Sequence, residues 1–219
     1  MTKEALLKLL SQVNAILSDS HVVYTSGKHG RAYVNKDAIY PHTDLTSQLC
    51  RQIAEHFAHH PVDVVVAPAL GGVLLAQWVA HHLSHLQNKK ILALYAEKTS
   101  DGGFELGRGY AELCRSKNVL ILEDIVNTGG SLKKVIHTVR ALPAHIIGAA
   151  CLCNRGQITC EDLENIPELY SLIELNLQAW EAEHCPLCQE GVAIHTGVGK
   201  GREFMKSRKP EFPKPHELS

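Results

Sequence analysis

Four short apolar runs, two of them followed by helical patterns, constrain the fold of this chain more than any other feature. The runs cover residues 62–67, 91–96, 119–122 and 146–152. Such continuous apolar runs are typical of strands that are buried on both faces. Apolar residues at helical spacing follow the first and third runs: Val73, Ala76, Ala80 and Leu83, then Leu132, Val135, Ile136 and Val139. This alternation predicts an α/β fold, a central parallel sheet flanked by helices.

The first sixty residues show a different pattern. Two helical patterns are expected there, the first on Leu6, Leu10, Val13 and Leu17 and the second on Leu45, Leu49, Ile53 and Phe57. Between them, residues 21–40 carry strand-forming Val, Tyr and Thr around the turn sequence SGKHG. This stretch predicts an extended hairpin, or hood, rather than a helix.

Composition excludes several classes of protein. The 219 residues carry a formal net charge of -1, with 22 Lys+Arg against 23 Asp+Glu, so a protein whose main task is to neutralise nucleic-acid phosphates is disfavoured. No apolar run reaches the ~20 residues of a membrane span, and the first residues lack the pattern of a secretory signal, which favours a cytoplasmic location. The seven cysteines are expected to be free thiols. Residues 199–219, with six Lys/Arg and three Pro, predict a polar, flexible tail.

The segment VLILEDIVNTGGSLKKVI, residues 119–136, carries the strongest chemical signal. A buried strand ends in Glu123 and Asp124, passes through Gly129 and Gly130, and enters a helix at Ser131. Backbone N–H groups at such a helix start form an anion site that suits a phosphate, and the two carboxylates can accept hydrogen bonds from sugar hydroxyls. A ribose 5-phosphate satisfies both. Neither a P-loop nor a G-x-G-x-x-G sequence is present, which disfavours nucleoside triphosphate hydrolysis and dinucleotide binding.

Residues 123–131, EDIVNTGGS, resemble the phosphoribosyl pyrophosphate (PRPP) motif of type I phosphoribosyltransferases. The resemblance continues along the chain to the orotate branch of that family through SGKHGRAYVNK, VDVVVAPALGGVLLA, YAEK, GRGY, Asn154-Arg155 and CPLCQEGVAI. It covers roughly residues 10–198. It implies a phosphoribosyltransferase domain over residues 1–198, with a hood formed by about 1–40 and part of the C-terminal segment. The implied reaction joins orotate and PRPP into orotidine 5′-phosphate and diphosphate, a step of pyrimidine nucleotide synthesis.

The resemblance also implies a role for each part of the PRPP site. Glu123 and Asp124 would hold the ribose hydroxyls, and the 5-phosphate would lie against Asn127, Thr128, Gly129, Gly130 and Ser131. The leaving diphosphate would meet the turn formed by Ala69, Leu70, Gly71 and Gly72. Lys98 and Arg108 would contact it from a mobile loop that usually reaches into a neighbouring subunit, which implies a homodimer, although each is also plausible as a solvated loop charge. Catalysis is expected from Asp124, Glu123 and Lys98, with Mg²⁺ held mainly through PRPP rather than by a dedicated protein site.

Base recognition is the part of the resemblance with the most departures. Arg155 resembles the arginine that meets the orotate carboxylate, and Asn127 and Tyr33 are further candidates for contact with the base. Asn127 stands where threonine is common, and Thr25 and Gly71 stand where many orotate enzymes carry lysine. Lys28 and Lys36 could supply the missing cations or be surface lysines. Two alternatives therefore remain: a salvage transferase for another base, and a PRPP-sensing regulator of the same fold without catalysis.

Cys185 and Cys188 have the spacing of half a zinc site. Cys151, Cys153 or Cys160 could supply further ligands. A single C-x-x-C is weak evidence, and the similar CPLC sequence of the orotate branch implies no metal chemistry. We therefore interpret it as a structural turn, with zinc binding or a redox pair as the alternatives.

Overall fold

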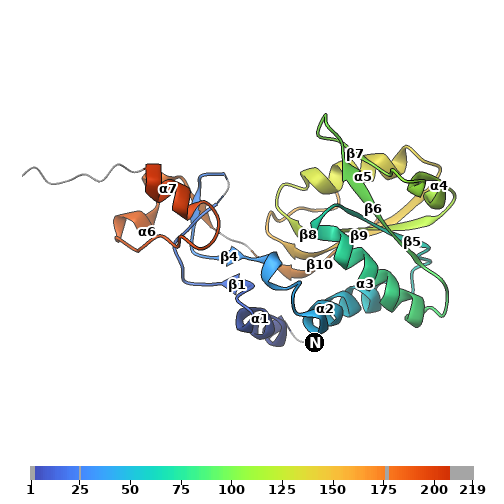
Figure 1. Cartoon of the computed structure of the whole chain (residues 1–219), viewed down its shortest axis with the longest axis horizontal. Helices are drawn as coiled ribbons and strands as arrows, with labels where there is room; N and C mark the ends of the chain where they lie inside the picture. Colours follow the sequence, from blue (N-terminus) through green and yellow to red (C-terminus); the bar gives the residue numbers. More distant parts are fainter. Residues whose placement is uncertain (1–2, 25, 176–177, 208–219) are drawn as a thin grey trace, which may run out of the picture. The chain divides into compact units, whose positions relative to one another are not determined.

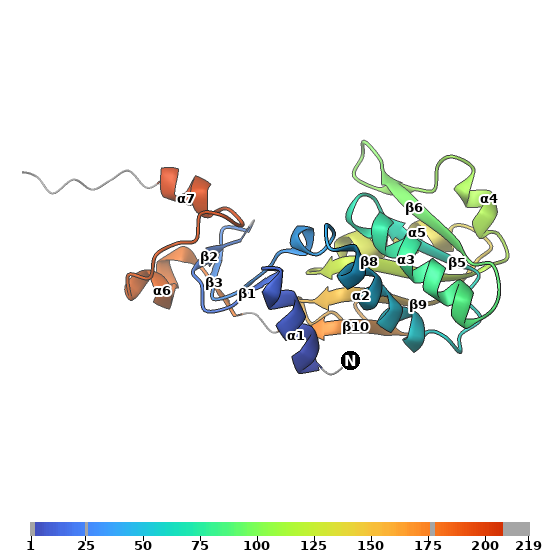
Figure 2. The same cartoon turned by 60° about the horizontal axis from the view of Figure 1, so that its bottom comes forward.

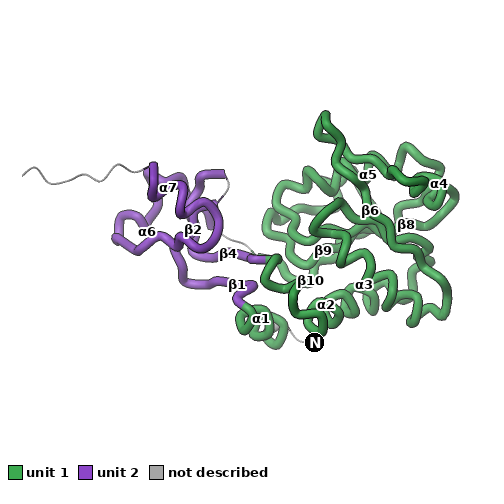
Figure 3. The backbone as a smooth tube through the Cα atoms, viewed as in Figure 1, with its two compact units in different colours: residues 1–13, 36–176 green, residues 14–35, 177–219 purple. Residues whose placement is uncertain are grey.

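The computed structural model describes residues 3–24, 26–175 and 178–207. The chain divides into two compact units, coloured separately in Figure 3: residues 1–13 with 36–176, and residues 14–35 with 177–219. The hood was predicted over about residues 1–40 and part of the C-terminal segment, and the second unit contains residues 14–35 of that range.

The first unit is built on a six-stranded sheet (Figure 1). Its strands are β5 (Val64–Pro68), β6 (Leu92–Lys98), β7 (Phe104–Glu105), β8 (Asn118–Val126), β9 (His145–Asn154) and β10 (Leu169–Glu174). The order across the sheet is β10-β9-β8-β5-β6-β7, and all neighbours are parallel except β6 and β7. The predicted parallel sheet is therefore confirmed. The sequence did not reveal β10, which is largely half-buried, or the short antiparallel β7.

Helices cover both faces of this sheet. The helices of the first unit are α1 (Lys3–Gln12), α2 (Thr43–His56), α3 (Gly71–Leu86), α4 (Tyr110–Cys114) and α5 (Gly130–Arg140), with a 3₁₀ turn η1 at Lys36–Ala38. Figures 1 and 2 show α2 and α3 on one face and α5 on the other. On the face of α5, Val66 and Ile121 pack in one cluster with Ile136 of that helix. Strand residues buried on both faces explain the continuous apolar runs.

The first helix is shorter than predicted. The helical pattern was expected to continue to Leu17, but α1 ends at Gln12, and Asn14 adopts a left-handed φ of 55° that stops the helix. Leu17 instead belongs to β1 (Ile16–Leu17), which pairs with β4 (Tyr33–Val34) in the second unit.

The second unit confirms the predicted hairpin. β2 (Val22–Val23) and β3 (His29–Gly30) are antiparallel, and β11 (Ala179–Trp180) adds to the other edge of β3. The C-terminal segment also forms a 3₁₀ turn η2 (Ala182–His184) and the helices α6 (Pro186–Gln189) and α7 (Gly201–Ser207).

Part of the stretch predicted as a flexible tail, residues 199–219, forms helix α7 in the structure. The ring of Phe204 packs edge-on against that of His29, with centroids 4.7 Å apart, and the Lys200 amide donates to the Val23 carbonyl over 2.8 Å. These contacts hold the helix although its sequence is polar. Residues 208–219 lie outside the described residues. No helix among those described combines the length and apolarity needed to cross a bilayer.

Candidate functional site

A cavity of about 160 Å³ lies where β8 ends and α5 begins. It is lined by Glu123 and by residues 125–132, which include all five positions predicted to hold the 5-phosphate. Gly129 precedes the helix with a left-handed φ of 70°, and a Cβ there would lie 3.1 Å from Leu163 Cδ2. The backbone therefore requires glycine at this position. The first turn of α5 presents N–H groups without intrahelical acceptors, which suits a phosphate.

The two acids at the end of β8 are buried, with Glu123 8% and Asp124 4% exposed. The Asp124 amide donates to Glu123 Oε1 over 3.2 Å, and the Ile125 amide donates to Asp124 Oδ1 over 2.6 Å. Burial, together with the charge of Asp124, raises the pKa of Glu123 to about 8. At pH 7 the Glu123 carboxyl is therefore mostly protonated, while hydrogen-bond donors brought by a ligand would favour its ionised form.

Asp124 is held by two side chains from the segment before α2. Lys36 Nζ forms an ion pair with Asp124 Oδ2, and the Tyr40 hydroxyl donates to the Gly71 carbonyl over 2.8 Å and lies 3.4 Å from Asp124 Oδ2. Burial acts to lower the pKa of Lys36, but the hydrogen bond to Asp124 and its charge outweigh this effect and raise that pKa above its ordinary value. Burial and the Asp124 charge likewise raise the pKa of Tyr40. The Lys36 ammonium and the Tyr40 hydroxyl are thus both held beside the Asp124 carboxylate.

The turn formed by residues 69–72 also lies against Asp124. A Cβ added to Gly71 would lie 1.9 Å from Asp124 Oδ2 and 2.7 Å from Lys36 Nζ. The backbone can approach the acid this closely only because residue 71 is glycine. Leu70 is 87% exposed, and the peptide bond between Ala69 and Leu70 is cis. The structure therefore brings the turn predicted for the diphosphate directly against the acid pair predicted for the ribose.

The backbone of Arg155 lies next to the loop of residues 127–131, the phosphate loop, which was predicted to hold the 5-phosphate. The amides of Arg155 and Gly156 both donate to the Val126 carbonyl, over 2.8 and 3.1 Å. A Cβ on Gly156 would overlap the Asn127 carbonyl oxygen at 1.5 Å, so the two loops are in close contact. Asn127 and Arg155, both predicted to meet the base, are therefore neighbours.

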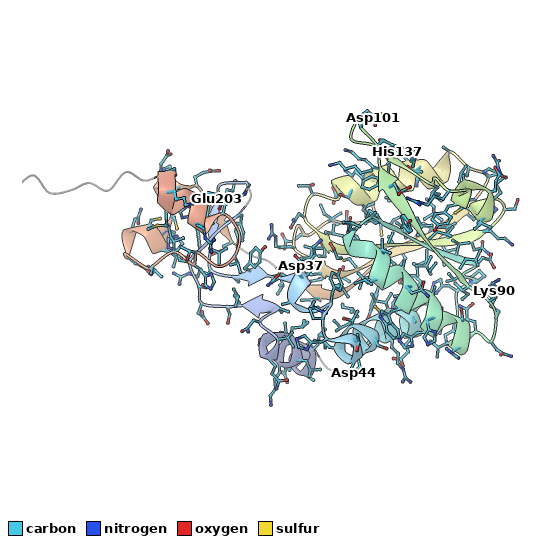
Figure 4. The ribbon with its side chains drawn as sticks, in the orientation of Figure 1. Asp37, Asp44, Lys90, Asp101, His137 and Glu203 are labelled. Carbon is cyan, nitrogen blue, oxygen red and sulfur yellow. The ribbon has the colours of Figure 1, made fainter. Side chains whose placement is uncertain are left out.

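Lys98 and Arg108 lie on the β6–β7 hairpin and the loop after it. Among the described residues, neither Lys98 nor Arg108 lines the cavity at the start of α5. Arg108 donates to both carboxylate oxygens of Glu97, over 2.8 and 3.2 Å. Lys134 of α5 holds the hairpin tip by donating to the Gly102 carbonyl over 2.6 Å, and Asp101, labelled in Figure 4, marks that tip. The structure does not bring these two cations to the acid pair.

Tyr33 lies in the second unit. It lines a cavity of about 390 Å³ together with Asn35, residues 196–199, Arg202 and Glu203. Lys28, one of the two lysines considered as replacement cations, also lies in this unit and pairs with Glu181 over 3.0 Å. Thr25 lies outside the described residues.

Sequence reasoning missed Tyr40 and left Lys36 undecided. Both follow the hood hairpin, 84 and 88 residues before Asp124. A single sequence carries no sign of such a long-range contact. Only the loss of lysine at position 71 hinted that a cation had to come from elsewhere.

The fold and this site define a class: α/β proteins that bind a sugar phosphate at the carboxyl ends of parallel strands. Residues 37–185 match the model of the phosphoribosyl transferase domain. The chain is 34% identical over 196 residues to the orotate phosphoribosyltransferase of Thermoanaerobacter sp. (strain X514), covering 89% of this chain and 96% of that relative. The chain therefore belongs to the phosphoribosyl transferase family.

Solved structures agree on the fold. Orotate phosphoribosyltransferase from Mycobacterium tuberculosis, in complex with PRPP, superimposes with a TM-score of 0.59 at 23% identity, over 79% of this chain and 96% of that one. Adenine phosphoribosyltransferase from Thermoanaerobacter pseudethanolicus gives a TM-score of 0.58 at 15% identity, over 76% and 99%. At these identities the similarity shows the fold alone.

Proposed function

We propose that this chain is a phosphoribosyltransferase that joins orotate to PRPP, giving orotidine 5′-phosphate and diphosphate. The observation that carries the choice of orotate is the 34% identity to an orotate phosphoribosyltransferase over nearly the whole of both chains. In the reaction the bond between ribose C1 and a diphosphate oxygen breaks, and its electron pair leaves with the diphosphate. A ring nitrogen of orotate bonds to C1 and loses its proton.

In this proposal, the groups at the end of β8 and the start of α5 bind the phosphate and the ribose of PRPP. The N–H groups at the start of α5 and the hydroxyls of Thr128 and Ser131 receive the 5-phosphate in the cavity. Glu123 and Asp124 accept hydrogen bonds from the ribose hydroxyls. The charge of Asp124, and that of Glu123 once the ribose hydroxyls favour its ionised form, also stabilise the positive charge that develops on the ribose as the diphosphate departs.

Lys36 supplies the cation that Gly71 cannot. Its ammonium lies beside both Asp124 and the turn at residues 69–72, which places a positive charge next to the route of the diphosphate. Backbone N–H groups of this turn add donors, because glycine allows close approach. Lys36 thus serves both to hold Asp124 and to stabilise the leaving group.

Lys98 and Arg108 act, in this proposal, from the hairpin after β6 on an active site of a neighbouring subunit in a homodimer. Arg108 is bound to Glu97 and must exchange this partner for a diphosphate oxygen. Because both side chains are exposed, the exchange has a small energetic cost. Arg155 is proposed to meet the orotate carboxylate, with Asn127 beside it.

Mg²⁺ is proposed as the cofactor. Magnesium prefers hard oxygen ligands and usually retains substrate phosphates and waters, and the oxygen-rich end of β8 fits that chemistry. It would be held mainly through PRPP, beside Glu123 and Asp124. When bound, it neutralises part of the diphosphate charge. A cytoplasmic location is proposed because no disulfide joins any of the seven cysteines, as in a reducing compartment.

The test is diphosphate release from PRPP and Mg²⁺ with orotate, adenine, guanine, hypoxanthine, xanthine and uracil offered separately. Turnover with orotate alone is expected, and Asp124→Asn should lower kcat/KM by about 10²-fold or more. Asp44→Asn is the matched control, since Asp44 is exposed in the first turn of α2 (Figure 4). Turnover with another base would overturn the choice of orotate. PRPP binding without turnover of any base would favour the regulator.

A further inference from the structure

Two histidines and two cysteines of the second unit converge in its interior. His21 precedes β2, His29 lies in β3, Cys185 precedes α6 and Cys188 lies within it. Their ligand atoms all lie within 4.8 Å of one another. His21 is 1% exposed, and His29 and Cys185 are fully buried. Four side chains that can ligate a metal, from segments near both ends of the chain, therefore lie together.

The spacing of the ligand atoms matches a tetrahedral metal site. His21 Nε2 lies 2.9 Å from His29 Nδ1 and 3.6 and 3.7 Å from the sulfurs of Cys185 and Cys188. Cys188 Sγ lies 3.3 Å from His29 Nδ1. A tetrahedron with Zn–N of about 2.0–2.1 Å and Zn–S of about 2.3 Å has N–N edges of about 3.3–3.4 Å and N–S edges of about 3.5–3.6 Å. The two nitrogens need to separate by only about 0.4 Å to meet these lengths.

The surroundings orient the ligands. The Nδ1 atom of His21 donates its proton to the Val192 carbonyl over 2.7 Å, which leaves Nε2 with a lone pair directed at the cluster. The Cys188 and Gln189 amides donate to the Cys185 carbonyl over 3.1 and 3.2 Å, so the C-x-x-C segment is a tight turn. A backbone carbonyl that fixes the histidine tautomer is the usual support of a metal-bound imidazole.

Charge and size favour the same conclusion. Two thiolates and two neutral imidazoles around Zn²⁺ carry no net charge, which makes their burial favourable. The described part of the second unit has a small apolar core, mainly Val22, Val23, Tyr24, Val34 and Leu187. Small units with so little core are commonly stabilised by disulfides or a structural metal. No disulfide joins the cysteines of this structure.

We infer that His21, His29, Cys185 and Cys188 bind a structural Zn²⁺ ion that joins the N-terminal hairpin to the C-terminal segment of the second unit. The donor set of two nitrogens and two sulfurs selects zinc, and four protein ligands leave no open position for catalysis. The earlier interpretation of Cys185 and Cys188 as a structural turn alone is thereby replaced. Cys151, Cys153 and Cys160, considered as the other ligands, belong to the first unit and not to this cluster.

The test measures metal directly on the full-length protein. The chain, purified without chelator, is expected to contain about one zinc ion per molecule by elemental analysis. After exchange, Co²⁺ should give intense visible bands of a tetrahedral site and thiolate-to-cobalt charge transfer. Cys188→Ser should lose both signals. Cys160→Ser, which changes a half-buried thiol of the first unit, is the matched control and should keep them.

Three results would overturn the inference: native protein that holds no zinc and gives no cobalt spectrum, a cobalt spectrum that survives Cys188→Ser, or a disulfide between Cys185 and Cys188. If Cys188→Ser fails to fold, metal content and the cobalt spectrum of the native chain still decide. A disulfide between Cys185 and Cys188, found by thiol counting after denaturation without reductant, would identify a redox pair instead. None of these readouts depends on transfer to orotate, so a failure of the proposed reaction is distinguishable.

Discussion

Replacing Glu123 by glutamine should make the stability of the protein less dependent on pH. The pKa of this carboxyl rises from 4.5 to about 8 in the folded chain through burial and the neighbouring Asp124 charge. The difference of about 3.5, at about 1.4 kcal/mol for each pKa unit, corresponds to about 5 kcal/mol. Because the folded state holds the proton more tightly, Glu123 contributes this stability below pH 4.5 and loses it as the pH rises to about 8. Glutamine has no proton to lose.

The assay is urea unfolding followed by circular dichroism at several pH values between about 5 and 9. The free energy of unfolding of Glu123→Gln minus that of the unmodified chain should increase by about 3–5 kcal/mol across this range. Titrating groups that do not interact with Glu123 cancel in that difference. The exposed Glu105 of β7 supplies the matched control Glu105→Gln, which removes one carboxylate of the same unit away from the acid pair. A flat difference for Glu123→Gln, or one that falls with pH, would refute the reasoning.

Three further predictions concern the same site. PRPP affinity should rise from about pH 6.5 to 8.5 more steeply in the unmodified chain than in Glu123→Gln, since ribose hydroxyls bind the ionised carboxylate; parallel slopes in calorimetry would contradict this. Gly71→Ala should lower kcat/KM by about 10²-fold or more with an unchanged circular dichroism spectrum, because the added Cβ meets Asp124 at 1.9 Å; an active variant would show that the turn can move away. Lys36→Met should lower the free energy of unfolding by about 1–2 kcal/mol, since it leaves the buried Asp124 without its cation and Lys36 is partly solvent-screened. The more exposed pair of Lys89 and Asp63 supplies the control Lys89→Met, and an equal loss in both variants would refute a special role for Lys36.

The sheet could be predicted because strands that are buried on both faces appear in the sequence as continuous apolar runs. β5 and the inner part of β8 are continuous apolar runs, and α5 shows an apolar stripe of helical period. The apolar pattern of β10 is weaker, because five of its six residues are only partly buried or exposed. The end of α1 depended on a single left-handed residue, Asn14, which periodicity does not register.

The candidate site was partly predictable for a similar reason. Glu123, Asp124 and the phosphate loop are consecutive, so their chemistry is visible in one segment. Lys36 and Tyr40 reach Asp124 across 88 and 84 residues, and no local pattern encodes that approach. The cluster in the second unit is the extreme case, since His21 and Cys185 are 164 residues apart. Half of it was recognised from its C-x-x-C spacing, and the histidines were not.

The two-segment composition of the second unit has a consequence for synthesis. β3 pairs on one side with β2, made early, and on the other with β11, which begins at Ala179. At about 5–20 residues per second, a ribosome needs on the order of ten seconds or more to make the intervening chain. Throughout that time one edge of β3 is without its native neighbour, and the strands of the six-stranded sheet are made in the same interval, ending with β10 at Glu174. A nascent chain released between Glu174 and Ala179 would therefore contain every strand of the six-stranded sheet, while its N-terminal hairpin would lack β11, the strand that pairs with the other edge of β3.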